Sequence, residues 1–237
     1  MFKNSKDSAD FRRVASGVLL IAAPLLQLAA LLVDPGTWGD EREAVSYGAD
    51  PVLSQVQSVL YHWSYLLAGL SVFGLLHVMR RRAVVFGHLA GTLTILGYVN
   101  GSALLMTDPV EWWLGRHHTP AESERILGEM LDLPGVVFGF QMPWLFFAIF
   151  GLPVLLIGVW RAGFAHWAVP LVAVLSSAGS MVTEYGPVTV PFWAATAGAV
   201  GWVGVRMLRM SREEWISYYP TAAPGRTTPD SYANTTA

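Results

Sequence analysis

Residues 135 to 160 read GVVFGFQMPWLFFAIFGLPVLLIGVW and contain no charged side chain. A helix needs about 20 apolar residues to cross the hydrocarbon core of a bilayer, so this run is long enough to span a membrane. Other stretches that meet this criterion lie near residues 14–33, 58–79, 83–106, 163–183 and 188–209. The sequence therefore predicts an all-α fold, a polytopic membrane bundle of six transmembrane helices.

The composition supports this class. Of the 237 residues, 53% are hydrophobic and 14% are charged, whereas charged residues make up about a quarter of an ordinary soluble domain. The first apolar run lacks a small-residue cleavage site before Asp34, so we expect a retained first helix. The chain has no cysteine, which excludes disulfides, thiolate metal sites and thiol nucleophiles.

The distribution of charge predicts the orientation. Short cytoplasmic loops carry the excess of lysine and arginine. If the N-terminus is cytoplasmic, only Arg42, Arg116 and Arg125 lie outside, and all the other basic residues lie inside. We therefore expect a multi-pass protein of the cell membrane with both termini cytoplasmic. The transmembrane domain should cover residues 1–217, followed by a disordered cytoplasmic tail at 218–237, which is polar and proline-rich.

The connection between the third and fourth predicted spans contains TDPVEWWLGRHHTPAE at residues 107 to 122. Asp108-Pro-Val-Glu111 and Thr119-Pro-Ala-Glu122 both have the pattern of a capped helix start. We therefore expect two short interfacial helices that form a lid over the outer end of the bundle. An alternative is a zinc site built from His117, His118 and Glu122, although no established zinc motif is present.

Small residues recur at four-residue spacing in two of the predicted spans. The third contains Gly87 with Gly91 and Gly97 with Gly101, and the sixth contains small residues near its middle. Such spacing lets another helix approach closely. We expect these residues to pack within one bundle, and the alternative is a homodimer through the same faces. The residues of the sixth span are Ala194, Gly198 and Gly201.

Polar residues in the predicted spans share one range of depth, in the outer halves of four helices. Polar groups inside a bilayer are costly and often functional. We expect them to rim a pocket in which Glu184 is the catalytic acid and His62 orients it or relays its proton. The alternative is a set of hydrogen bonds between helices. The predicted substrate-binding residues are Tyr61, Tyr65, Asn100, Gln141 and Tyr185, and Ser102, Ser176, Ser177, Ser180 and Thr183 lie at similar depth.

Three histidines lie near the predicted inner ends of their helices, at His77, His88 and His166. Two of them facing each other could ligate a haem, which is the characteristic site of an electron-transfer subunit. Arginine or tryptophan neighbours favour interfacial anchoring instead. We therefore expect neither a cofactor nor a bound metal.

In size, helix count and content of acidic and aromatic residues, the chain resembles the compact membrane-bound terpene cyclases that cyclise prenylated substrates. The resemblance is architectural, because no stretch matches their carboxylate-bearing motifs and seven helices would be expected in that family. It implies an enzyme that acts on a lipophilic, isoprenoid substrate by acid-initiated cyclisation. The alternative is a non-catalytic protein that binds a lipid or small molecule in an accessory, immunity or export role. The expected partners are the bilayer and this lipophilic molecule, and no nucleic acid is expected.

Overall fold

The computed structural model describes residues 5–38, 47–48, 50–183 and 186–217, and they form helices joined by turns. The longer helices are α1 (Ser5–Val33), α4 (Pro51–Met79), α5 (Val84–Leu104), α9 (Gly151–Arg161), α10 (Ala168–Val182) and α11 (Thr189–Arg209). The shorter ones are α2 (Pro35–Trp38), η1 (Leu105–Thr107), α6 (Asp108–His117), α7 (Pro120–Leu131), α8 (Pro134–Val136), η2 (Val137–Gln141), η3 (Trp144–Ile149) and α12 (Arg212–Ser217). The described residues contain no strand, so the predicted all-α class is confirmed.

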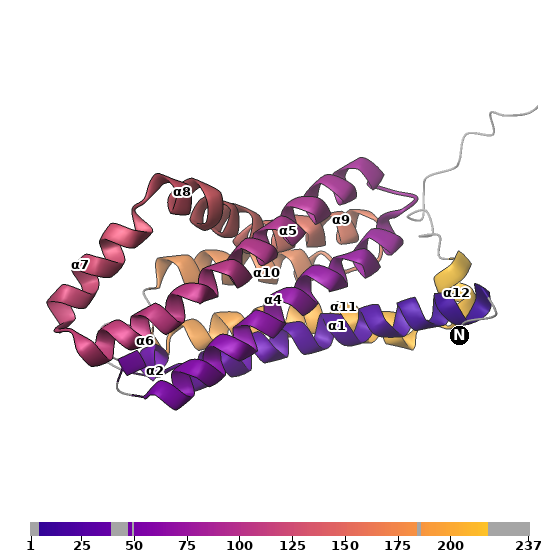
Figure 1. Cartoon of the computed structure of the whole chain (residues 1–237). Coiled ribbons are helices and arrows are strands. Elements are labelled where there is room, and N and C mark those ends of the chain that lie inside the picture. The colour runs from indigo at the N-terminus through magenta and orange to yellow at the C-terminus, as the bar shows by residue number, and fades with distance from the viewer. Residues whose placement is uncertain (1–4, 39–46, 49, 184–185, 218–237) are drawn as a thin grey trace, which may run out of the picture.

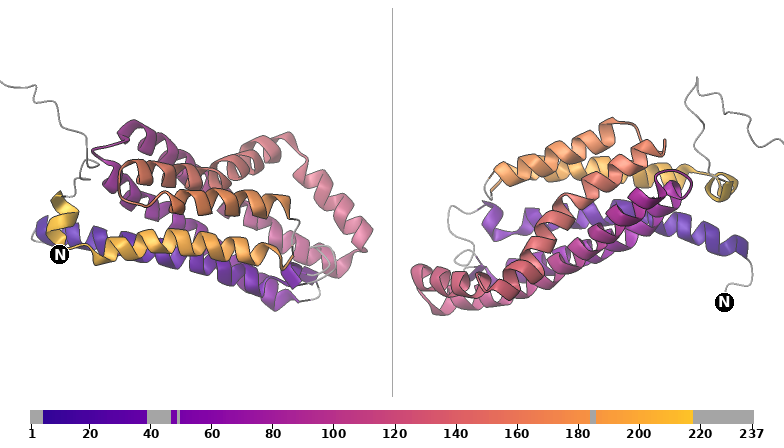
Figure 2. Two further views of the ribbon diagram at one scale, coloured as in Figure 1. Left: turned by 180° about the vertical axis from the view of Figure 1, so that it is seen from behind. Right: turned by 90° about the horizontal axis from the view of Figure 1, so that it is seen from above.

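The long helices pack side by side as a closed ring. Helix α1 packs between α4 and α11, and α5 packs between α4 and the segment formed by η3 and α9. Helix α10 completes the ring between α9 and α11. The first and last long helices are therefore neighbours (Figures 1 and 2). The apolar core includes Leu75, Leu155 and Val203, which are fully buried.

Four helical stretches in the described residues are long and apolar enough to cross a membrane, namely Ser8–Val33, Pro51–Met79, Val84–His117 and Pro134–Arg161. They correspond to the first four predicted spans. Helix α10, at the position of the fifth, has 15 residues, which at 1.5 Å per residue extends about 22 Å. Helix α11 has 21 residues but is not among these four stretches. The prediction of six crossings therefore stays a prediction.

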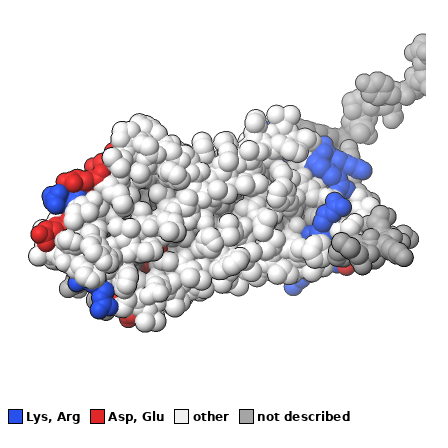
Figure 3. Space-filling model, viewed as in Figure 1, with Lys and Arg blue, Asp and Glu red and all other residues white. Residues whose placement is uncertain are grey.

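Charged residues gather at the two ends of the bundle. Most of the visible lysine and arginine side chains lie at the end where α1 begins and α12 lies, and most of the aspartate and glutamate side chains lie at the opposite end (Figure 3). We call these the basic end and the acidic end. The visible face between them is almost free of charge, as expected of a surface that faces lipid. The structure contains no membrane, so the side on which each end lies stays a prediction.

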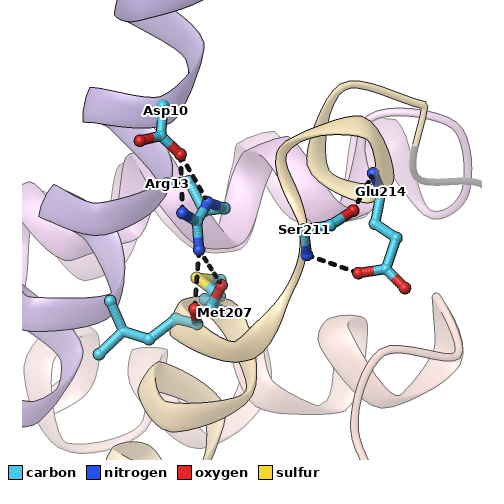
Figure 4. Close-up of polar contacts among 6 residues, drawn as sticks. Asp10, Arg13, Met207, Ser211 and Glu214 are labelled. Carbon is cyan, nitrogen blue, oxygen red and sulfur yellow. Dashed lines mark hydrogen bonds and ion pairs between the residues drawn. The ribbon is translucent and has the colours of Figure 1, made fainter.

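The basic end is held together by contacts between the first and last helices. The guanidinium of Arg13 donates to the carbonyl of Leu208 at 2.7 Å and to Asp10 Oδ1 at 2.7 Å (Figure 4). Ser211 and Glu214 cap each other at the start of α12. Arg13 therefore satisfies a carbonyl that the end of α11 would otherwise leave without a helical partner.

The predicted helix cap at Asp108 is wrong. Asp108 has helical backbone angles, and α5 continues through η1 into α6 as one stretch from Val84 to His117. The tighter turn of η1 precedes Pro109, whose missing N–H cannot donate to a regular helical ladder. The Asp108 side chain accepts a hydrogen bond from Ser58 instead. The second predicted cap is confirmed, because Thr119 and Glu122 form a reciprocal capping box.

The fourth predicted span is not a regular α-helix. Its segments η2 and η3, on either side of Met142 and Pro143, are π-helical, and the regular helix α9 follows. Proline removes a backbone donor, which explains the irregular winding here. Helix α5 packs against η3 at Gly97, where a β-carbon would overlap the backbone of Phe147 and Ala148. Glycine at this position therefore permits backbone-to-backbone contact.

The small residues of the third predicted span pack within the bundle. Gly91 lies against Val72 and Leu76 of α4, and Gly101 lies against Trp144. In α11, by contrast, a β-carbon added at Gly198 or Gly201 would have no atom of another helix within 4 Å. The homodimer alternative is not tested by these contacts.

Candidate functional site

A cavity of about 510 Å³ lies inside the helix ring. All the long helices of the ring contribute to its wall, together with η1, η2, η3, α6 and α7. Ligand sites in helix bundles commonly occupy such spaces, which have volumes of about 300 to 1,000 Å³. The apolar part of the wall includes Leu20, Leu31, Ala68, Leu145, Leu152, Ala173 and Val200.

Aromatic side chains form one side of the cavity. The rings of Tyr61 and Tyr65 stack with centroids 5.9 Å apart, and Tyr65 lies 5.9 Å from Tyr98. Trp144 fits beside them because Gly101 has no side chain, and a β-carbon there would overlap the indole. These rings give the cavity large apolar faces whose negative quadrupoles also attract cations.

Two buried carboxylates contribute to the wall at the acidic end. The exposed fractions are 9% for Asp108 and 5% for Glu111, and both residues line the cavity. They are one helical turn apart on α6, so they share a face. Ser58 Oγ donates to Asp108 Oδ2 at 2.5 Å. This places two acidic groups beside the aromatic surface.

A set of hydrogen-bonded polar side chains extends from Asp108 into α4. The side-chain amide of Gln57, the residue before Ser58, donates to the Tyr47 hydroxyl at 3.1 Å, and Ser54 donates to the carbonyl of Asp50 at 2.8 Å. Gln57 and Tyr47 also line the cavity. The end of the cavity near Asp108 is thus polar, whereas its deeper wall is mainly apolar.

Three of the predicted substrate-binding residues line the cavity, namely Tyr61, Tyr65 and Gln141. The amide of Gln141 donates to the carbonyl of Leu131 in α7 at 3.3 Å. Three more polar residues of the predicted set line the cavity, namely Ser177 and Ser180 of α10 and Thr183 directly after it. The structure thus brings these side chains together in the wall of one cavity, and their role in binding a substrate stays a prediction.

Two predicted site residues are placed elsewhere. His62 is not among the lining residues, and its Nδ1 is 2.8 Å from Ser102 Oγ on α5. The amide of Asn100 donates to the carbonyl of Leu96 in its own helix at 2.8 Å, and it does not line the cavity either. Both residues lie on faces of their helices that do not line the cavity. Glu184 and Tyr185 lie outside the described residues.

Helices α6 and α7 line the acidic end of the cavity through Glu111 and Leu131. Their role as a lid stays a prediction. Whether these helices lie at a membrane surface is not tested by the structure. Trp113 has 47% of its surface exposed, and its ring stacks on that of His117 with centroids 4.8 Å apart.

The haem alternative receives no geometric support. His77 stacks on Trp215, whereas His88 contacts the carbonyl of Val84 in its own helix. His166 accepts from the backbone of Ala168. In the predicted zinc set, His118 Nδ1 lies 4.0 Å from Glu122 Oε2, but that oxygen also accepts from Thr119 in the capping box of α7. Within the part of the chain that the structure describes, no group of three or more histidine, aspartate and glutamate side chains could hold a metal ion.

Sequence reasoning missed several lining residues. Asp108 and Glu111 were assigned to a helix cap, since local sequence gives no sign of their contact with α4. Gln27 and Gln57 could have been predicted to line a site, because each is an uncharged polar residue within an apolar helix. The other missed side chains include Tyr47, Tyr98, Trp144 and Trp193.

Comparisons with known proteins do not add to this geometry. No family model matches the sequence, and neither a curated protein nor a solved structure shows significant similarity to the chain. The function of the chain is therefore inferred from the cavity.

Proposed function

We propose that this chain is a multi-pass membrane protein that binds a lipophilic small molecule inside its helix ring. The observation that carries the proposal is the cavity of about 510 Å³, which combines a largely apolar and aromatic wall with polar side chains that include Asp108, Glu111 and Gln57 at the acidic end. An amphiphilic molecule would place its apolar part against Tyr65 and Trp144 and its polar part toward Asp108. Burial of apolar surface contributes about 25 cal/mol per Å², so such a wall favours a lipophilic ligand over a polar metabolite.

The membrane topology belongs to this proposal. Six crossings with both termini in the cytoplasm agree with the closed ring and with the gathering of arginine at the basic end. They also agree with the contact of Arg13 in α1 with the end of α11. The acidic end and the polar part of the cavity would then face outward, and the ligand would enter from the bilayer or from the outer side.

Ligand binding is testable with a diazirine-bearing long-chain alcohol as photoactivatable probe. We expect crosslinks to peptides that contain Tyr65 and Trp193, because both line the cavity. Ser177→Phe would fill the cavity from α10 and should lower this labelling severalfold. Leu175→Phe is the matched control, since Leu175 is exposed on another face of the same helix and should leave labelling unchanged. Equal labelling in the wild type and in Ser177→Phe would refute binding at this site.

A second candidate function is acid-initiated chemistry on the bound molecule, and the placement of Asp108 and Glu111 beside aromatic rings favours it. A carboxylic acid at either position would protonate an epoxide oxygen or an alkene. For an epoxide, the C–O bond breaks toward oxygen, and an internal alkene attacks the carbocation to form a new C–C bond. The final cation loses a proton, which returns to the carboxylate. Aromatic faces stabilise the cations on this route.

Glu184, the acid that the sequence predicts, stays within this second candidate, since it follows Thr183, which lines the cavity. The test is turnover of a prenylated phenol that carries a terminal epoxide, with the cyclised isomer separated by chromatography. Replacement of the true acid should lower turnover about 100-fold or more, as expected of a general acid, with probe labelling retained. The variants are Asp108→Asn, Glu111→Gln and Glu184→Gln. No turnover by the wild type would leave the binding function and remove the enzymatic one.

A further inference from the structure

A shallow groove lies on the outer surface of the ring at the basic end, away from the cavity. It has a volume of about 280 Å³ and is lined by Trp202, Val205, Arg206 and Arg209 of α11. We call these four residues the α11 groove. They share one face of the helix, since they lie three or four residues apart. The groove thus combines two cations with an apolar floor.

The guanidinium of Arg206 is held in place by aromatic rings. It lies 4.9 Å from the centroid of Phe164 and 5.6 Å from that of Trp202. Stacking of this kind fixes the plane of the guanidinium while its N–H groups remain able to donate. Arg206 is therefore positioned for a ligand that accepts several hydrogen bonds, such as a phosphate.

The two arginines of the groove have no acidic counterpart among the described residues. Arg13 pairs with Asp10 and Arg125 pairs with Glu129, but no carboxylate in the described part of the chain pairs with Arg206 or Arg209. Two arginines three residues apart in the last turn of α11 give a local positive charge. Charge complementarity calls for an anionic ligand at this end.

The groove continues into an apolar surface along α11. The exposed fractions are 43% for Trp202 and 37% for Val205. Further along the same face, a β-carbon added at Gly198 or Gly201 would have no atom of another described helix within 4 Å. A hydrocarbon chain could follow this face from the arginines toward the middle of the bundle. Trp202 would then lie at the boundary between the polar and apolar parts, where tryptophan is enriched in membrane proteins.

We propose that the α11 groove binds an anionic phospholipid, with its phosphate on Arg206 and Arg209 and an acyl chain along Val205 and Gly201. A second copy of the protein fits this face less well. Copies related by an axis along the membrane normal would bring the arginines of both chains to one depth, and like charges that meet in an interface repel. The site is independent of the cavity and of the function proposed for it.

The test uses purified protein in a neutral maltoside detergent and native mass spectrometry. We expect phosphatidylglycerol to remain bound in preference to phosphatidylcholine, because only the former carries net negative charge. The double variant Arg206→Gln/Arg209→Gln should weaken phosphatidylglycerol binding by about tenfold or more, since each basic residue near an anionic lipid contributes about 1 kcal/mol. The control Arg116→Gln/Arg125→Gln loses the same charge at the acidic end and should bind as the wild type does.

Four outcomes would overturn the proposal. Equal retention of the two lipids, or an unchanged affinity in the double variant, would show that the site does not recognise an anionic headgroup. Competition by inorganic phosphate at the same concentration as the lipid would show that the acyl chain does not contribute to binding. A dimer that the double variant strengthens or abolishes would assign the face to a second copy. If the double variant does not fold, Arg209→Gln alone serves, because its side chain makes no hydrogen bond or ion pair within the described residues.

Discussion

Ser58 and Asp108 are 50 residues apart in the chain, and their side chains form a hydrogen bond of 2.5 Å that joins α4 to α6. Hydrogen bonds to a charged group contribute about 1.5 to 3 kcal/mol, and this one is partly buried. Ser58→Ala should therefore lower the free energy of unfolding in detergent by about 1 to 3 kcal/mol. The control is Gln55→Ala, because exposed Gln55 bonds only within its own helix and its loss should cost much less. Equal losses would show that the contact with Asp108 does not stabilise the fold.

The contact of α5 with η3 requires glycine at position 97. A methyl group there would overlap the backbone of Ala148, which cannot move as a flexible side chain does. Gly97→Ala should destabilise the protein by about 1 to 3 kcal/mol, as overpacking does in tight cores. Gly69→Ala is the matched control, since Gly69 has no other atom within 4 Å of the new β-carbon. Thermal unfolding in detergent measures both, and a loss in Gly69→Ala equal to that in Gly97→Ala would contradict the steric argument.

Helix α12 should detach if Trp215 is removed. The indole is 2% exposed and stacks on His77 with centroids 3.8 Å apart, and Arg80 donates to the carbonyl of Ile216 at 2.6 Å. Trp215→Ala removes the stack and leaves a cavity, so trypsin should cleave after Arg212 at least several times faster. Trp167→Ala is the control, since that side chain is 54% exposed. An unchanged cleavage rate in Trp215→Ala would show that the indole does not hold α12 in place.

The start of α7 should lose stability in acid. Hydrogen bonds from the backbone and side chain of Thr119 lower the pKa of Glu122 below its ordinary value. Because the folded pKa is the lower one, the stabilisation is complete above the unfolded pKa of about 4.3 and disappears as pH falls through the folded value. Protection factors of the α7 amides from hydrogen exchange should fall in this range.

Glu122→Gln should abolish this pH dependence, whereas Glu129→Gln, in the same helix, should retain it. A pH dependence that persists in Glu122→Gln would assign the effect to another carboxylate. Thr119→Ala should lower helix stability at neutral pH by about 1 kcal/mol, the usual cost of losing such a cap.

The helical architecture could be predicted because hydropathy and segment length depend on the sequence alone. The predicted fourth run at 135–160 corresponds to the helical stretch Pro134–Arg161. Winding could not be predicted in the same way. The π turns around Pro143 and the continuation of α5 into α6 depend on contacts with other helices, and the local pattern at Asp108 favoured a cap that the structure does not form.

The sequence predicts which polar residues lie near one another along their helices, but not the direction in which each side chain points. Tyr65 and Gln141 line the cavity, whereas His62 and Asn100, at a similar depth, contact other groups. Hydropathy gives the position of a residue along the membrane normal. The direction of its side chain around the helix axis depends on which helices are neighbours, and the ring order sets this.

The π turns at Val137–Gln141 and Trp144–Ile149 border the cavity, and each contains more residues per turn than an α-helix. Deletion of one residue here would restore α-helical winding. It would also rotate the part of this helix that precedes the deletion by about 100°. Such a rotation would turn different side chains toward the cavity. Deletion of a single residue, without any substitution, would therefore alter ligand preference while leaving the other helices of the ring intact.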